Sequence, residues 1–218
     1  MIPTAYVRLF LVRHGEAAAN IEMRYLGSQD DALTERGTWQ AEQLAHALGQ
    51  LPITAVYTSP LRRTAMTAAA IAQACNLPVQ ADVRLREGAF GAWEGLTRAE
   101  VLARSDQDAA LLAQWERDPG CAPPEGDSLE TVQSRSLACI QDLQTRHPDD
   151  WIVLVSHVSP IKALLCAALG VPLTVGRQLF LDPATISVID WGEQPIVRLF
   201  NAHAHLGWDS ARWMTRKR

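Results

Sequence analysis

The residues with the clearest chemical potential are Arg13 and His14, which directly follow the short apolar run Val7–Val12. A guanidinium beside an imidazole suits a ligand whose negative charge is spread over several oxygen atoms. Gly15 comes next, and its missing Cβ would let such a ligand approach the backbone closely. A polar strand end that turns at a glycine would have the same composition, so the chemical interpretation needs support from elsewhere in the chain.

Polar residues also follow three other strand-like runs. They are Ser59, Arg62 and Arg63 after 55–58, Arg86 and Glu87 after 79–85, and Ser156 and His157 after 151–155. In open α/β sheets, ligands bind outside the carboxyl ends of the strands. We therefore expect histidines, arginines and one carboxylate to gather in a single crevice.

Such a cluster has the composition of a site for a phosphoryl dianion. Arginine forms bidentate hydrogen bonds with phosphate oxygens. Nearby arginines lower the pKa of a histidine, so its imidazole stays unprotonated and nucleophilic near neutral pH. A carboxyl group beside it can protonate a leaving alkoxide and later remove a proton from water.

Strand-like and helix-like runs alternate along the chain without a repeat or a low-complexity linker. We expect strands over 7–12, 55–58, 79–85, 151–155, 185–191 and 196–200, and helices over 34–48, 62–75, 99–103, 109–117, 128–146 and 160–169. This alternation favours one α/β domain over 1–218 with a mostly parallel sheet. The turn 192–194 predicts an antiparallel hairpin at one edge, and the irregular segment 88–124 is interpreted as an insertion or lid.

Single residues allow finer predictions. Thr34 is expected to cap the helix over 34–48, and Trp39 to belong to its apolar positions. Pro160 suits the first turn of the last helix, and Gly170 suits the position after its end. His147, in polar surroundings, is expected to face solvent.

Composition argues against several functional classes. The 218 residues suffice for one sizeable domain, and 48% hydrophobic with 20% charged residues is ordinary for a soluble globular protein. A formal net charge of -4 argues mildly against a nucleic-acid-binding surface. No apolar run is long enough to cross a bilayer, and the first residues lack a signal-type n-region. We expect a cytoplasmic protein with no nucleic-acid or membrane partner; its oligomeric state stays open, a homodimer included.

The four cysteines are scattered and form no C-x-x-C pair; they are Cys75, Cys121, Cys139 and Cys166. We interpret them as free thiols in a reducing cytoplasm, because nothing in their spacing supports a metal site. The basic end Arg212–Arg218 is interpreted as a solvated tail.

At the level of motifs, the chain resembles the histidine phosphatase superfamily, also called phosphoglycerate mutase-like. The matching blocks cover nearly the whole chain and are Leu11–Glu16 with Asn20, Ser59–Arg63 with Thr67 and Ala68, Glu87 with Phe90–Gly95, Gly126–Ser128 with Arg135, and Val155–His157. Several blocks in family order are far more specific than a lone motif. The resemblance implies a three-layer α/β/α sandwich.

The resemblance also implies roles for individual residues. His14 would be the nucleophile that becomes phosphohistidine, and Glu87 the general acid and then the base. The phosphoryl oxygens would be held by Arg13, Arg63, His157 and Asn20. Family spacing selects Arg63 over its neighbour Arg62. Arginines and histidine would neutralise the phosphate charge, so neither a metal nor another cofactor is expected.

Other positions have weaker assignments. Glu94 lies in the same turn region as Glu87 and is the alternative proton donor. Leu26 and Gly27 would bring backbone close to the substrate, or Gly27 would only permit a turn. Val158 stands where the family often has glycine, and its side chain would narrow the crevice.

The compact segment 87–95 lacks the long insertion of the mutases, which favours water as the final acceptor of the phosphoryl group.

Segments 156–167 and 201–207 look most like metal-independent phosphoserine phosphatases. In that group, residues near the chain end shape the pocket, as His205 and Trp208 would here. Phe90 counts against phosphoserine, because that group tends to have histidine there. Phosphoserine is the leading substrate, with α-ribazole phosphate and sugar phosphates open. The rivals are a phosphoglycerate mutase, a phospho-ligand sensor, and a zinc site using His14 and His157.

Overall fold

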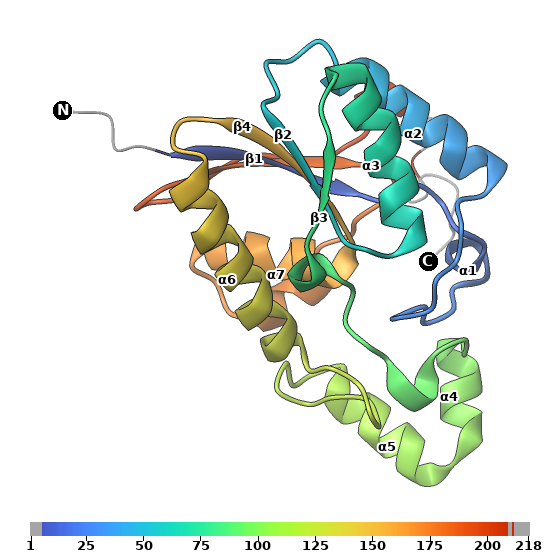
Figure 1. The fold of residues 1–218 in the computed structure, drawn as a ribbon. Coiled ribbons are helices and arrows are strands. Elements are labelled where there is room, and N and C mark those ends of the chain that lie inside the picture. Colours follow the sequence, from blue (N-terminus) through green and yellow to red (C-terminus); the bar gives the residue numbers. More distant parts are fainter. Residues whose placement is uncertain (1–5, 209–210, 212–218) are drawn as a thin grey trace.

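The computed structural model describes residues 6–208 and Ala211; the predicted basic tail lies outside this range. Within it, six strands form one sheet in the order β3-β2-β4-β1-β5-β6 (Figure 1). The strands are β1 Val7–Arg13, β2 Ala55–Thr58, β3 Val79–Ala81, β4 Trp151–Ser156, β5 Ile186–Trp191 and β6 Ile196–Ala202. The pairs among β1 to β4 are parallel, whereas β5 pairs antiparallel with both β1 and β6. The predicted mostly parallel sheet with an antiparallel hairpin at one edge is confirmed.

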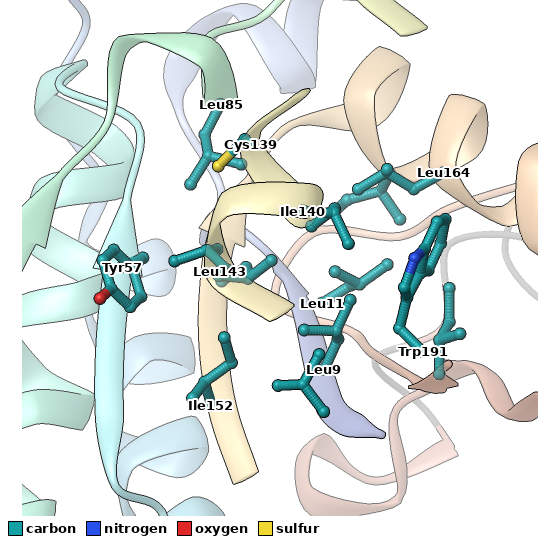
Figure 2. Packing of buried hydrophobic residues seen from close by; sticks show 14 of the residues in the cluster. Leu9, Leu11, Tyr57, Leu85, Cys139, Ile140, Leu143, Ile152, Leu164 and Trp191 are labelled. Carbon is teal, nitrogen blue, oxygen red and sulfur yellow. The ribbon is translucent and has the colours of Figure 1, made fainter. Parts of the chain in front are cut away.

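Helices cover both faces of this sheet. They are α1 Ala18–Glu22, α2 Glu35–Leu48, α3 Arg62–Cys75, α4 Arg98–Arg104, α5 Asp106–Trp115, α6 Leu129–Arg146 and α7 Val158–Leu169. On one face, Leu9 and Leu11 of β1 pack with side chains of α6 and α7 (Figure 2). On the other, Phe10 and Val12 pack with side chains of α2 and α3. Burial on both faces explains why β1 and β4 are continuous apolar runs, and the three-layer α/β/α prediction is confirmed.

Segment 88–124 carries α4 and α5, which lie beyond the carboxyl ends of the central strands (Figure 1). It has its own small cluster around Trp93, Val101 and Leu112. The ring of Tyr25, from the loop before α2, packs at 4.8 Å from Phe90 and 5.9 Å from Trp115. The segment is thus tied by aromatic contacts to the loop that follows α1.

Several local predictions are confirmed. The Thr34 side chain accepts a hydrogen bond from the Gly37 amide and caps α2. Gly170 ends α7 in the left-handed conformation, at φ 63°. All four cysteines fall within the described residues and are free thiols.

Other local predictions are wrong. The third strand ends at Ala81, because the Asp82 side chain accepts from the Arg84 amide and starts a 3₁₀ turn. No helix is predicted before α2, because the segment is polar, but the short helix α1 lies there. The last helix begins at Val158, two residues before the predicted start. Pro160 nevertheless lies in the first turn, as expected, where the backbone amides need no helical partner.

Two side chains were also misplaced. Trp39 is 41% exposed, and the neighbouring Gln40 is buried instead because its amide oxygen accepts from the Glu16 amide. His147 does not face solvent: its ring contacts the Tyr57 hydroxyl at 2.8 Å and the Asp150 carboxylate at 2.9 Å.

Within the described residues, no helix combines the length and the apolar character needed to cross a membrane.

Candidate active site

The parallel register aligns the carboxyl ends of β1, β2 and β4 at one edge of the sheet. Arg13 pairs with Ser156, while Thr58 and Val155 are partners one position earlier. The residues that follow, His14 and His157, therefore lie side by side with ring centroids 5.1 Å apart. The structure thus brings together residues far apart in sequence, at the edge where the sequence places them.

The His14 ring has a defined tautomer. Its Nδ1 lies 2.7 Å from the Gly15 carbonyl oxygen. A carbonyl oxygen only accepts hydrogen bonds, so Nδ1 carries the proton and Nε2 keeps its lone pair. The side chain is buried, with 3% of the residue exposed, and it lines a cleft.

Both ring pKa values lie well below the ordinary 6.5. For His14 the main cause is burial, followed by the charges of Arg13 and Arg63. For His157 the causes are burial and then the neighbouring His14 and Arg63. Both imidazoles are consequently neutral at physiological pH.

The two arginines are held by backbone carbonyls. Arg63 donates to the carbonyls of Gly27 at 2.9 Å and Gln29 at 2.6 Å, and Arg13 donates to Leu181 at 2.6 Å. Carbonyls fix a guanidinium without neutralising its charge. Arg63 is 1% exposed, whereas Arg62 is on the surface, as the family spacing indicates.

His157 lies behind the cleft instead of lining it. It is fully buried, its Nε2 lies 2.9 Å from the Ser59 hydroxyl, and its Nδ1 has no hydrogen-bond partner within the described residues. Its ring packs beside that of His14 on the buried side of the cleft.

Glu87 is anchored at the start of α7. Its carboxylate accepts hydrogen bonds from the amides of Val158, Ser159 and Gly88, all between 2.9 and 3.1 Å. The Arg135 guanidinium donates to the carbonyls of Arg84, Arg86 and Glu87, and so fixes the segment that carries Glu87. This contact gives the Arg135 motif a structural role.

Glu94 has a different environment. Its carboxylate accepts from the Ser28 amide and hydroxyl and from the Phe90 amide, and it is not among the residues that line the cleft. At Gly27, φ is +52° and a Cβ would come within 2.1 Å of that carboxylate. Glu94 and Gly27 thus join the loop after α1 to segment 88–124.

The cleft has a volume of about 350 Å³. The predicted residues that line it are Arg13, His14, Asn20, Leu26, Gly27, Arg63, Glu87 and Val158. His205 does not line it: its Nε2 donates to the Ala184 carbonyl at 2.9 Å. Trp208 is 66% exposed, packs against the His203 ring and is also outside the lining. The predicted pocket role of His205 and Trp208 is therefore not supported by their positions.

The role predicted for Gly15 needs correction. A Cβ there would lie 2.5 Å from the Gly37 carbonyl oxygen, and one on Gly37 would lie 2.1 Å from the Glu16 carbonyl oxygen. Glycine at both positions lets α2 approach the end of β1. The constraint is a contact between two segments of backbone, which holds His14 in place.

Sequence reasoning missed the cations and rings of the cleft wall. Arg24, Lys162 and Arg177 line it, together with Tyr25 and Trp115. Phe90, which the sequence had linked to the substrate, lines it as well. The sequence spacing could have indicated Lys162. This residue lies three residues after Ser159 and four after Val158, and therefore on the same face of the helix. Arg177 comes from the 3₁₀ turn Leu173–Gln178, which no pattern indicated.

In the described part of the chain, no three histidine, cysteine, aspartate or glutamate residues are grouped so that they could hold a metal ion.

Residues 9–202 match the model of the histidine phosphatase superfamily (branch 1). The chain belongs to this superfamily. This histidine phosphatase is 37% identical over 203 residues to phosphoserine phosphatase 1 of Hydrogenobacter thermophilus, covering 92% of this chain and 95% of that protein. It is 35% identical over 190 residues to a probable phosphoglycerate mutase of Cronobacter sakazakii, covering 87% of each.

Among solved structures, the fold is similar to the phosphoserine phosphatase of Entamoeba histolytica in complex with 3-phosphoglyceric acid. The TM-score is 0.81 at 28% identity, over 92% of this chain and all of that one. The superfamily and its phosphatase-named relatives support a phosphatase.

The His14 environment predicts a measurable tautomer and charge. In ¹⁵N NMR, His14 should show the neutral ring with the proton on Nδ1, and it should stay neutral well below pH 6.5, since burial and two arginines lower its pKa. The same histidine in the urea-unfolded chain provides the control and should titrate with a pKa of about 6.5. A protonated ring at pH 6.5 in the folded protein would contradict this geometry.

Proposed function

We propose that the protein hydrolyses small phosphomonoesters through a phosphohistidine formed on His14. The observation that carries this proposal is the hydrogen bond from His14 Nδ1 to the Gly15 carbonyl, beside two buried arginines. It leaves Nε2 as a neutral nucleophile where a phosphate dianion would be attracted. Neutral imidazole and fixed positive charge are what nucleophilic attack on phosphorus requires.

In the proposed first step, His14 Nε2 attacks phosphorus and the ester oxygen leaves. Arg13 and Arg63 bind the phosphoryl oxygens, with Asn20 and His157 as further donors. Glu87 gives its proton to the leaving alkoxide. In the second step, Glu87 removes a proton from a water molecule that attacks the phosphohistidine, which releases phosphate and restores His14.

We propose that no metal ion is needed. The support is the positive charge already present at the cleft: Arg13 and Arg63 both line it, and two backbone carbonyls orient the guanidinium of Arg63 while leaving it charged. Guanidinium groups fixed in this way stabilise the charge of the transition state as a bound cation would.

We infer that segment 88–124 serves as a lid within a single catalytic domain. Phe90 and Trp115 from this segment, with Tyr25, form an aromatic wall of the cleft. Such a wall would exclude bulk water from the reacting phosphate. Phosphoserine is the leading substrate, because one relative is named a phosphoserine phosphatase. We also propose a cytoplasmic location, where small phosphorylated metabolites of this kind occur.

A phosphoglycerate mutase is the second candidate, because the chain is 35% identical to a protein named as a probable one. Incubation with 3-phosphoglycerate separates the two activities. Isomerisation that outruns phosphate release would reject hydrolysis as the main reaction.

The first test is phosphate release from phosphorylated amino acids, sugars and nucleotides with a chelator present. We expect turnover of at least one small ester, and a loss of about 1,000-fold or more in kcat for His14→Ala. His46→Ala, which removes an exposed histidine of α2, is the matched control and should retain turnover. Activity that disappears with chelator, or survives in His14→Ala, would refute the proposal.

The second test concerns the proton donor. Glu87→Gln should lower kcat about 100-fold or more for alkyl phosphates, whose leaving groups need a proton, and far less for p-nitrophenyl phosphate. Glu94→Gln, outside the cleft, is the control and should affect both ester types alike. Equal losses for the two ester types in Glu87→Gln would reassign the acid.

A further inference from the structure

The cleft holds more positive charge than one phosphate needs. Its lining contains five cationic side chains and two carboxylates; these are Arg13, Arg24, Arg63, Lys162 and Arg177, against Glu87 and Asp127. Arg24 is already compensated by ion pairs with Glu22 and Glu100. If Arg13 and Arg63 bind the phosphoryl group, Lys162 and Arg177 remain.

Lys162 has no hydrogen bond or ion pair to any side chain in the described residues, although it lines the cleft. It lies on α7 one turn after Val158 and Ser159, whose amides hold the Glu87 carboxylate. The side chain is therefore placed close to the reacting groups. A long amine with no protein partner beside a catalytic acid is expected to have a partner in the substrate.

Arg177 adds to the same wall. Its guanidinium lies over the Trp115 ring, 4.3 Å from the centroid, and donates to the Trp115 carbonyl. Its Nε is buried without a hydrogen-bond partner in the described range. These contacts fix the group but leave its charge uncompensated by a hydrogen-bonded carboxylate.

The electrostatic environment of Lys162 is one that a bound anion would stabilise. The pKa of Lys162 is lowered to about 8, chiefly by burial and then by the charge of Arg13. The charged and titratable groups around it are Arg13 at the end of β1, Glu87 before α7, Arg177 in the following 3₁₀ turn, and Cys166 on α7. Arg177 also lowers this pKa, whereas Glu87 and Cys166 raise it, and an anion bound beside the ammonium would raise it further.

We propose that Lys162, supported by Arg177, binds a carboxylate of the substrate, so that the enzyme prefers phosphomonoesters of small hydroxy acids over esters that lack the acid. This inference rests on the proposed phosphatase function and narrows its substrate class.

The test uses two substrate pairs that differ at one group. Phosphoserine is compared with phosphoethanolamine, and 3-phosphoglycerate with glycerol 3-phosphate. Within each pair, the ratio of kcat/KM values measures recognition of the carboxylate. In Lys162→Met this ratio should fall about 10- to 50-fold, as expected for loss of a charged hydrogen bond. Lys162→Arg should restore most of it.

Arg62→Met is the matched control, because it removes an exposed positive charge close to the cleft but outside its lining. It should leave both ratios within about 2-fold. A ratio unchanged in Lys162→Met, or lowered equally in Arg62→Met, would overturn the inference. Lys162→Gln provides a second variant in case Lys162→Met does not fold.

The pH dependence gives an independent readout. In the wild type, the ratio should decline as the pH rises above about 8, where Lys162 loses its proton. In Lys162→Arg it should stay constant, because arginine remains charged. The same decline in both proteins would contradict the role of Lys162.

Failure of the inference can be separated from failure of the phosphatase function by measuring binding without turnover. Calorimetry on His14→Ala should show tighter binding of 3-phosphoglycerate than of glycerol 3-phosphate, and the added Lys162→Met change should remove the difference. If the wild type releases no phosphate but this difference is found, the phosphatase proposal fails and the carboxylate site stands. Equal binding of both ligands to His14→Ala would refute the carboxylate site.

Discussion

The site depends on one hydrogen bond, from His14 Nδ1 to the carbonyl of the next residue, Gly15. It fixes the tautomer and leaves Nε2 available in a place where burial and two arginines keep the ring uncharged. The backbone of residues 14–16 must therefore keep a fixed conformation at the end of β1. Close contact between Gly15 and Gly37, and the hydrogen bonds of Thr34 and Gln40 with Glu16, provide that support from α2.

The structure buries positively charged groups, which is energetically unfavourable, and a bound phosphate would compensate for this by its negative charge. Burial lowers the pKa of Arg63 as well as that of both histidines. The backbone carbonyls of Gly27 and Gln29 orient Arg63, and the loop that carries them is tied to segment 88–124 through Glu94. Groups oriented in advance need little reorganisation during reaction, which is the main source of electrostatic catalysis.

Sequence reasoning succeeded where the physical signal is local or repeated. Val7–Val12 is apolar because both faces of β1 are buried, Thr34 has the side chain of a helix cap, and Arg63 was distinguished from Arg62 by family spacing. It failed where contacts are distant. The Gly15–Gly37 approach, the His147–Tyr57 hydrogen bond and the Arg177–Trp115 stacking all join elements that no local pattern connects. The pocket role of His205 rests on resemblance alone, and in the structure its ring donates a hydrogen bond to the Ala184 carbonyl.

The most direct test of the central claim is to trap the enzyme during turnover of p-nitrophenyl phosphate by rapid quenching into base, then locate the phosphorus by peptide mass spectrometry and ³¹P NMR. The structure predicts phosphorus on Nε2 of His14, because Nδ1 is committed to the Gly15 carbonyl. Phosphorus on Nδ1 or on another residue, or turnover with no phosphorylated enzyme at any quench time, would contradict the account.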